Sequence, residues 1–260
     1  MINLKTCLFC NKPLAKYYDQ PAFSRCRACG LILRNPFPDQ RELDALYHSS
    51  WEEPQYRISE TGNVDMRLAR QYTKALVSSL KQENLSGQKI VDYGAGKGSL
   101  MRAFKECGAE TFGIEPYGAE HLRRKGFNVF VSTSEIPEAL RFDGAITMDV
   151  VEHLREPWVD FEKLYSLLNP GAWICVCTPN PHGLHARLQR SKWREVARPG
   201  HILLFEEGTL ALMLQQAGFC DFRRLRWQIR HSSNFLKSLA HFLLQACYLD
   251  GHLCVLARKL

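Results

Sequence analysis

The stretch IVDYGAGKGSLMRAF, from Ile90 to Phe104, decides the fold class of this 260-residue chain. A mostly apolar run with one acid leads into Gly-Ala-Gly-Lys-Gly, and a helical pattern follows. A strand that ends in glycines and enters a helix is typical of a nucleotide-binding turn. The stretch therefore predicts a bound nucleotide, and its surroundings narrow the choice.

Strand and helix patterns alternate along the chain from Lys89 onward. We expect strands at 89–93, 110–114, 128–131, 145–148 and 173–177, and helices at 99–107, 119–125, 158–168 and 209–217. This alternation predicts an α/β fold, a doubly wound, Rossmann-like, mostly parallel sheet with helices on both faces. Ligands of such sheets bind beyond the carboxyl ends of the strands, so Asp92, the glycine turn, Glu115 and Asp149 are expected to share one crevice.

The spacing of the turn glycines discriminates between nucleotides. Gly94, Gly96 and Gly98 give G-x-G-x-G, which lacks both the hydroxyl of a P-loop and the spacing of a dinucleotide fold. Asp92 would repel a pyrophosphate but suits a cationic amino group, and Glu115 can accept both hydroxyls of a ribose. These features favour S-adenosylmethionine, which carries an ammonium and a sulfonium and has no phosphate.

On these residues the chain resembles the class I S-adenosylmethionine-dependent methyltransferases. The matching elements occur in family order over residues 86–260: VDYGAGKG, GIEP, FDGAITMDVVEHLREP, LLNPGAWICVCTPN and HLCVLARK. The resemblance implies a seven-stranded sheet whose final antiparallel strand is inserted between two others. The chain is also similar to a subgroup with an N-terminal four-cysteine zinc module, whose members often modify sugars, lipid-linked glycans or natural products.

The resemblance also implies roles for individual residues. Gly94, Gly96 and Gly98 would let the backbone approach the methionine portion of the cofactor. Asp92 would hold its ammonium group, directly or through water, and Glu115 its ribose diol. Asp149 would meet the cofactor at the end of the fourth strand, and the adenine contact would come from Ser134 or Glu135.

Four cysteines near the N-terminus predict a structural zinc site. Cys7-x2-Cys10 and Cys26-x2-Cys29 are separated by fifteen residues, and two such knuckles complete a tetrahedral site with no open position. We therefore divide the chain into a zinc-binding module (1–34), a linker with covering helices (35–85) and a methyltransferase domain (86–260). Within this domain we expect a lid insertion at 182–204 and a helical insertion at 231–250.

Two groups are candidates for activating a methyl acceptor. Asp149, Glu152 and His153 would share one face of a helical turn, and they resemble the triad with which ubiquinone-type O-methyltransferases hold a divalent ion. Alternatively, Glu152 and His153 only shape the entrance of a helix in a metal-free enzyme. His201, in the lid insertion, is the second candidate, because histidine is suited to take a proton near neutral pH; its alternative role is structural.

The net charge of +7 is concentrated in the last third of the chain. Residues 182–260 contain 12 Lys/Arg and 5 Asp/Glu, whereas residues 1–181 contain 22 of each. If Arg187, Arg190, Lys192, Arg194 and Arg198 line the lid, an anionic acceptor is expected; otherwise they form a solvated surface. The apolar segment at 231–250 packs in the core or a dimer contact, or rests on an anionic membrane as an interfacial helix.

Composition and motifs together give a functional hypothesis. Ten cysteines without a secretory leader indicate a reducing compartment, and we expect a cytoplasmic protein. The expected function is methyl transfer from S-adenosylmethionine to a hydroxyl of a small-molecule or glycan-type acceptor. An RNA methyltransferase is an alternative, although no aromatic-interleaved basic run favours nucleic acid. A non-catalytic cofactor-binding protein is a second alternative.

Overall fold

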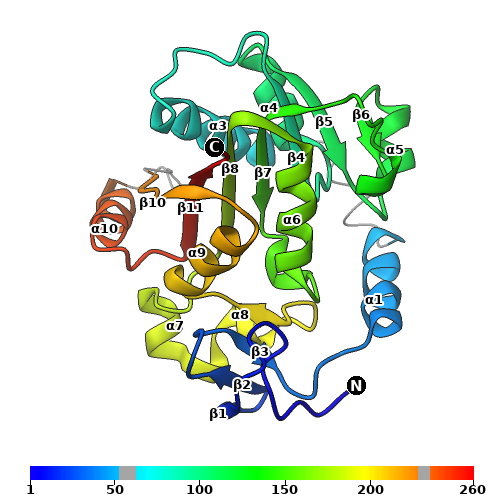
Figure 1. The fold of residues 1–260 in the computed structure, drawn as a ribbon. Helices are drawn as coiled ribbons and strands as arrows, with labels where there is room; N and C mark the ends of the chain where they lie inside the picture. The colour runs from blue at the N-terminus through cyan, green and yellow to red at the C-terminus, as the bar shows by residue number, and fades with distance from the viewer. Residues whose placement is uncertain (53–62, 228–234) are drawn as a thin grey trace.

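A computed structural model describes residues 1–52, 63–227 and 235–260 of the chain. Its central feature is a seven-stranded sheet in the order β6-β5-β4-β7-β8-β11-β10 (Figure 1). The strands are β4 (Lys89–Tyr93), β5 (Glu110–Ile114), β6 (Asn128–Phe130), β7 (Phe142–Met148), β8 (Leu168–Pro179), β10 (Cys220–Arg224) and β11 (His252–Arg258). β4 to β8 are parallel, and β11 runs antiparallel between β8 and β10, which confirms the topology expected from the resemblance.

Helices cover both faces of this sheet, because each helix has one apolar side to bury. The helices α3 (Asn63–Ser79), α4 (Ser99–Glu106) and α5 (Ala119–Arg124) lie on one face, and α6 (Pro157–Leu167) and α9 (Glu207–Gln216) on the other (Figure 1). On the first face Leu76 and Phe104 pack with Ile90, and on the second Phe161 and Leu214 belong to one buried cluster with Val176.

The strands β7 and β8 are longer than expected from the sequence. β7 begins at Phe142 rather than Ala145, and Phe142 pairs with Leu168, the first residue of β8. The sequence NPGA, expected to separate helix from strand, therefore lies within β8. The apolar pattern underestimated both strands because polar or exposed residues interrupt it near their starts: Asp143 in β7, and Pro170 and Gly171 in β8.

A second, smaller sheet joins the N-terminal module (1–34) to the segment 182–204, where a lid insertion is expected. It contains β1 (Leu14–Asp19), β2 (Ala22–Cys26), β3 (Ile32–Arg34) and, from the insertion, β9 (Leu203–Leu204). Ile32 and Leu33 pair with Leu204 and Leu203, and Thr209 donates a 2.6 Å hydrogen bond to the carbonyl of Cys29. The module is therefore part of the layer that carries the insertion.

Some of the remaining elements lie at the end of the sheet where a ligand is expected. α1 (Gln40–Glu52) begins with a capping box, in which Asp39 and Glu42 each accept the other's backbone N–H. The insertion contains α7 (Leu184–Gln189), η4 (Arg190–Lys192) and α8 (Arg194–Ala197), and the short helices η2 (Thr133–Glu135) and η3 (Val151–His153) follow β6 and β7. α10 (Phe235–Ala246) precedes β11, and among the described helices none has the length and hydropathy to cross a membrane.

Candidate active site

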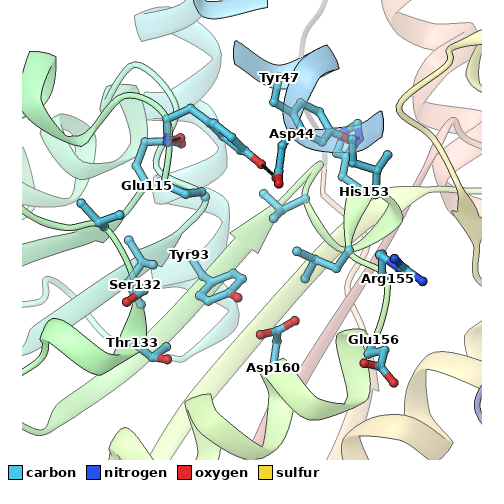
Figure 2. A pocket seen from close by; sticks show the side chains of 18 of the residues that line it. Asp44, Tyr47, Tyr93, Glu115, Ser132, Thr133, His153, Arg155, Glu156 and Asp160 are labelled. Atoms are coloured by element: carbon cyan, nitrogen blue, oxygen red, sulfur yellow. Dashed lines mark hydrogen bonds between the residues drawn. The ribbon is translucent and has the colours of Figure 1, made fainter. Parts of the chain in front are cut away.

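A cavity of about 620 Å³ opens at the carboxyl ends of β4, β5 and β7 (Figure 2). The glycine turn and Glu115 line one side, and α1, η3 and the start of α6 line the other. The crevice expected from the strand order therefore exists, and it is roofed by a helix from the segment that precedes the sheet.

The glycine turn has a backbone conformation that residues with a side chain rarely adopt. Gly94, Gly96 and Gly98 all have positive φ angles, of 80°, 51° and 76°. A Cβ atom at Gly94 would lie 2.4 Å from Cγ2 of Val150, so this position is closed to any other residue as the neighbouring loop stands. Gly94 and Gly96 line the cavity, and Gly98 forms the N-cap of α4.

Two buried acids flank this turn. Glu115 is 6% exposed and lines the cavity, and its carboxylate accepts backbone N–H bonds from Gly96 at 2.9 Å and Tyr117 at 3.1 Å. Asp92 is 3% exposed, lies near the end of β4 and, contrary to expectation, is not among the described residues that line the cavity. Burial, followed by the negative charge of Glu115, raises the pKa of Asp92 to about 7, and burial raises the pKa of Glu115.

The expected adenine contacts, Ser134 and Glu135, do not line the cavity. Both are exposed, and Glu135 pairs with Arg123 at 2.9 Å and accepts the Val131 N–H at 2.8 Å. Ser132 and Thr133, two residues earlier, line the cavity instead (Figure 2). The loop after β6 does reach the site, but η2 turns its later residues toward solvent.

The expected triad of Asp149, Glu152 and His153 does not converge. Asp149 has a φ of 54° and precedes η3, so it is not on the helical face that the spacing assumed. Asp149 is one of the residues that line the cavity, and its Oδ1 lies 3.7 Å from Nε2 of His252 on β11. Near Asp149, the described residues whose ligand atoms lie within 4.8 Å of one another are Glu152, His153 and His201, without Asp149.

Of the two candidate histidines, only His153 reaches the cavity. His153 lines it, and its Nδ1 lies 2.9 Å from both the Gly200 carbonyl and the Tyr47 hydroxyl. His201 is 3% exposed and is not among the described residues that line the cavity, and burial lowers its pKa to about 3. His201 therefore does not fit the role of a free base for an acceptor, and its ring packs edge-on against that of His153, with centroids 4.7 Å apart.

Several cavity residues were not anticipated from the sequence. The rings of Tyr47 from α1 and Tyr117 pack at a tilt of 39° with centroids 5.5 Å apart, and the Tyr117 hydroxyl donates a hydrogen bond to Asp44 at 2.8 Å. Arg155 and Lys163 also line the cavity. The sequence predicted covering helices within residues 35–85, but only the tertiary structure shows that α1 (Gln40–Glu52) covers this cavity.

The basic residues of the insertion lie away from this cavity. Arg187, Arg190, Lys192, Arg194 and Arg198 are absent from the described residues that line it, and Arg194 and Arg198 pair with Glu195 at 2.8 and 3.1 Å. The positive charges of the cavity come from Arg155 and Lys163, with Glu156 and Asp160 beside them. The cavity thus has mixed charge.

The four N-terminal cysteines converge as expected. Their sulfur atoms all lie within 4.8 Å of one another, with closest pairs Cys10–Cys26 at 3.4 Å and Cys7–Cys29 at 3.6 Å. A tetrahedral zinc site with Zn–S bonds of about 2.3 Å requires sulfurs about 3.8 Å apart. The donor set and its spacing therefore fit zinc.

Comparison with known proteins agrees with this geometry. The family described as "Methyltransferase domain" matches residues 65–221, more than half of the chain. A ubiquinone biosynthesis O-methyltransferase of Paraburkholderia phymatum is 31% identical over 108 residues, 37% of this chain and 47% of that protein. The mitochondrial ubiquinone biosynthesis O-methyltransferase of Rattus norvegicus is 27% identical over 158 residues, 54% of this chain and 46% of that protein. The chain spans about half the length of these curated relatives.

A solved structure shares the fold over nearly the whole chain. The 1,6-didemethyltoxoflavin-N1-methyltransferase of Burkholderia thailandensis, with bound 1,6-didemethyltoxoflavin and S-adenosylhomocysteine, superposes with a TM-score of 0.54. The superposition covers 94% of this chain and 98% of the Burkholderia chain, and the two sequences are 20% identical. With the family match, the strand order and the glycine turn, this places the chain in the class I S-adenosylmethionine-dependent methyltransferases.

Proposed function

We propose that this protein transfers the methyl group of S-adenosylmethionine to a hydroxyl group of a small-molecule acceptor. One observation carries the proposal: a single cavity joins the cofactor side, at Gly94, Gly96 and Glu115, to the space under α1. The relatives named as O-methyltransferases support a hydroxyl acceptor. Nothing in these comparisons favours a glycan or RNA.

The cofactor would lie along the glycine turn. Glu115 would accept the ribose hydroxyls, and Ser132 and Thr133 would flank the adenine in place of Ser134 and Glu135. The carboxylate of Asp92, on β4 next to the turn, would compensate the positive charge of the amino group. Because S-adenosylmethionine already contains a good leaving group, the protein's main contribution is to align the acceptor oxygen with the methyl group.

The acceptor would occupy the space between α1 and α6. Tyr47, Tyr93 and Tyr117 offer aromatic surface there, and Arg155 and Lys163 can bind an anionic substituent. The hydroxyl would be activated near His153, because His153 is the member of the Glu152–His153–His201 cluster that lines the cavity.

Methyl transfer can be tested with S-adenosylmethionine that carries a deuterated methyl group. Incubation with small aromatic and aliphatic hydroxyl compounds, and with the small-molecule fraction of a cell extract, should give labelled methyl ethers detected by mass spectrometry. Glu115→Ala serves as the control that should lose the product. Label recovered on RNA or on nitrogen would contradict the hydroxyl acceptor, and cofactor binding without any transfer would favour a non-catalytic protein.

The pKa of Asp92 predicts a pH dependence of cofactor affinity. In the folded, ligand-free protein the Asp92 carboxyl has a pKa of about 7, whereas in the unfolded chain its pKa is near 3.8. Between these two pH values the folded state holds a proton that the unfolded state has lost. The free energy of unfolding therefore falls as the pH rises through this range. A bound ammonium group favours the ionised form, so binding should release a proton. We expect the affinity for S-adenosylhomocysteine to rise about tenfold from about pH 6 to about pH 8.

Calorimetry in buffers of different ionisation enthalpy would measure this proton release. Asp92→Asn should remove the part of the pH dependence that comes from the carboxyl while leaving any contribution from the ligand's own amino group. An identical pH profile in the wild type and in Asp92→Asn would remove Asp92 from the account of cofactor binding.

The four-cysteine cluster is best explained as a structural zinc site. All four sulfurs would be used as ligands, so no position remains for a substrate. Its place in the sheet with β9 gives the zinc module a mechanical role, which is to hold the insertion that carries Gly200 and His201 against the cavity.

A further inference from the structure

Arg34, at the end of β3, connects the zinc module to the segment 196–201 of the insertion. Its Nη2 donates hydrogen bonds to the carbonyls of Val196 and Arg198 at 3.0 and 2.8 Å, and its Nε donates to the carbonyl of His201 at 3.3 Å. Residues 198–202 lie between α8 and β9, so this side chain supplies contacts to a segment that is neither helix nor strand.

The same segment carries Gly200, whose carbonyl oxygen is shared by two residues that line the cavity. Nδ1 of His153 lies 2.9 Å from this oxygen, and the Tyr47 hydroxyl donates a hydrogen bond to it at 3.1 Å. We propose that Arg34 is a positioning residue for methyl transfer, which fixes the Gly200 carbonyl and thereby the two cavity side chains that contact it. This role rests on the proposed function, in which the acceptor lies beside both of these side chains.

Arg34 is itself anchored in the zinc module. It pairs with Phe23 across β2 and β3, and its guanidinium carbon lies 5.0 Å from the centroid of the Phe23 ring, which is fully buried. The backbone N–H of Arg34 donates to the Ile202 carbonyl at 2.8 Å, and β2 ends at Cys26, one of the four clustered cysteines. The guanidinium therefore has a defined direction toward the insertion.

The guanidinium of Arg34 contacts carbonyl groups rather than a carboxylate. In the described part of the module and the insertion, the arginines that form ion pairs are Arg25, Arg194 and Arg198. Burial lowers the pKa of Arg34, because a cation is unfavourable away from water without a compensating anion. An apolar side chain of similar length would avoid this cost, so the three contacts to carbonyls point to a role other than stability.

The Gly200 carbonyl selects one tautomer of His153. A carbonyl oxygen only accepts hydrogen bonds, so Nδ1 of His153 carries the proton and Nε2 has the free lone pair. The Tyr47 hydroxyl lies 2.9 Å from the same Nδ1. Displacement of the Gly200 carbonyl would release both side chains, and the proton of the imidazole would then distribute between its two nitrogens.

The contact at Gly200 leaves no room for displacement toward the cavity. A Cβ atom there would lie 2.9 Å from the Tyr47 hydroxyl oxygen, 3.3 Å from Nδ1 of His153 and 3.4 Å from Cδ2 of Leu46. Because α1, η3 and the insertion meet at this point, a shift of residues 196–201 acts directly on the acceptor side of the cavity.

The cofactor side of the cavity is held by other contacts. Glu115 accepts the backbone N–H groups of Gly96 and Tyr117, which belong to the loops after β4 and β5. Loss of the hydrogen bonds of Arg34 should therefore lower the rate of methyl transfer and leave the affinity for the cofactor unchanged.

The tautomer of His153 tests this role without any acceptor. In protein labelled with ¹⁵N in its histidine rings, the wild type should show His153 protonated at Nδ1, its signals being those that disappear in His153→Gln. Arg34→Met removes the three hydrogen bonds and keeps an unbranched side chain, so His153 should become a mixture of both tautomers. An unchanged His153 spectrum in Arg34→Met would overturn the proposal.

Arg27→Met is the matched control. Arg27 is an exposed arginine of the same module, next to Cys26, and its replacement should leave the His153 spectrum and the zinc content as in the wild type. Arg34→Lys keeps the charge, but one ammonium group cannot donate from the positions of both Nε and Nη2. It should therefore resemble Arg34→Met, and its spectrum decides the matter should Arg34→Met fail to fold.

Methyl transfer provides the second readout. With the hydroxyl compound that the wild type methylates best in the deuterium assay, Arg34→Met should lower kcat by at least about tenfold, because small misplacements of reacting groups have effects of this size. The dissociation constant of S-adenosylhomocysteine should stay within about twofold of the wild type. An unchanged kcat, or an equal loss of cofactor affinity, would contradict a positioning role. If the wild type methylates no hydroxyl compound, the proposed function fails, whereas the tautomer measurement still decides whether Arg34 positions His153.

Discussion

Replacing Cys26 by serine is expected to release zinc and to lower the free energy of unfolding by on the order of 5 kcal/mol, since structural zinc contributes about 10–16 kcal/mol of apparent binding energy to isolated zinc modules. Cys26 is fully buried at the end of β2, and its sulfur lies 3.4 Å from that of Cys10. The segment 1–34 is too short to bury an adequate core alone, so it depends on the metal.

The effect should extend beyond the module. β3 pairs with β9, Thr209 donates to the Cys29 carbonyl, and Arg34 anchors residues 196–201. Loss of zinc should therefore also loosen the insertion that carries Gly200 and His201. Elemental analysis and thermal unfolding measure the two effects.

Cys247→Ser provides the matched control for the zinc prediction. Cys247 is exposed and follows α10, outside the four-cysteine cluster. It should keep one zinc per chain and an unchanged melting temperature. If Cys26→Ser also kept both, the cluster would be a group of ordinary core thiols.

Local features of the sequence were sufficient to predict the fold. The alternation after Lys89 predicted the parallel strands, and the glycine turn with Asp92 and Glu115 predicted the side of the cavity where the cofactor is expected, because each signal lies within one strand–turn–helix unit. The four-cysteine cluster could also be predicted, because two Cys-x2-Cys pairs are the spacing typical of a zinc site.

The acceptor side could not be predicted in the same way. Tyr47 and His153 are 106 residues apart, and no local pattern shows that their side chains meet. The spacing of Asp149, Glu152 and His153 suggested one helical face, but the positive φ of Asp149 breaks that face before η3 begins. His201 was placed in a lid over the crevice, whereas the pairing of β9 with β3 draws it behind the cavity wall.

The helical insertion stays a prediction. Residues 228–234 lie outside the described part of the chain, as do the side chains at the start of α10. Phe242 and Leu243 on α10 are 43% and 55% exposed, which is compatible with a dimer contact or with an interfacial helix.

Glu115→Ala is expected to weaken binding of S-adenosylhomocysteine by about 1–3 kcal/mol, or roughly 5- to 150-fold. The carboxylate would accept two charge-assisted hydrogen bonds from the ribose, and its removal also leaves the N–H groups of Gly96 and Tyr117 without their present acceptor. Isothermal titration calorimetry measures the change directly.

Glu135→Ala is the control that separates this effect from a general change in charge. Glu135 is an exposed acid on the neighbouring loop that pairs with Arg123 and does not line the cavity. Its removal should leave the affinity for S-adenosylhomocysteine unchanged. Equal losses in the two variants would mean that Glu115 acts only through the overall charge at this edge of the sheet.

The structure of the protein with S-adenosylhomocysteine tests the central claim most directly. The account predicts that the ligand fills the glycine-turn side of the 620 Å³ cavity, with its ribose on Glu115, its adenine beside Ser132 and Thr133, and its sulfur facing the space next to His153. An empty cavity at saturating ligand, or a ligand bound elsewhere, would contradict the account.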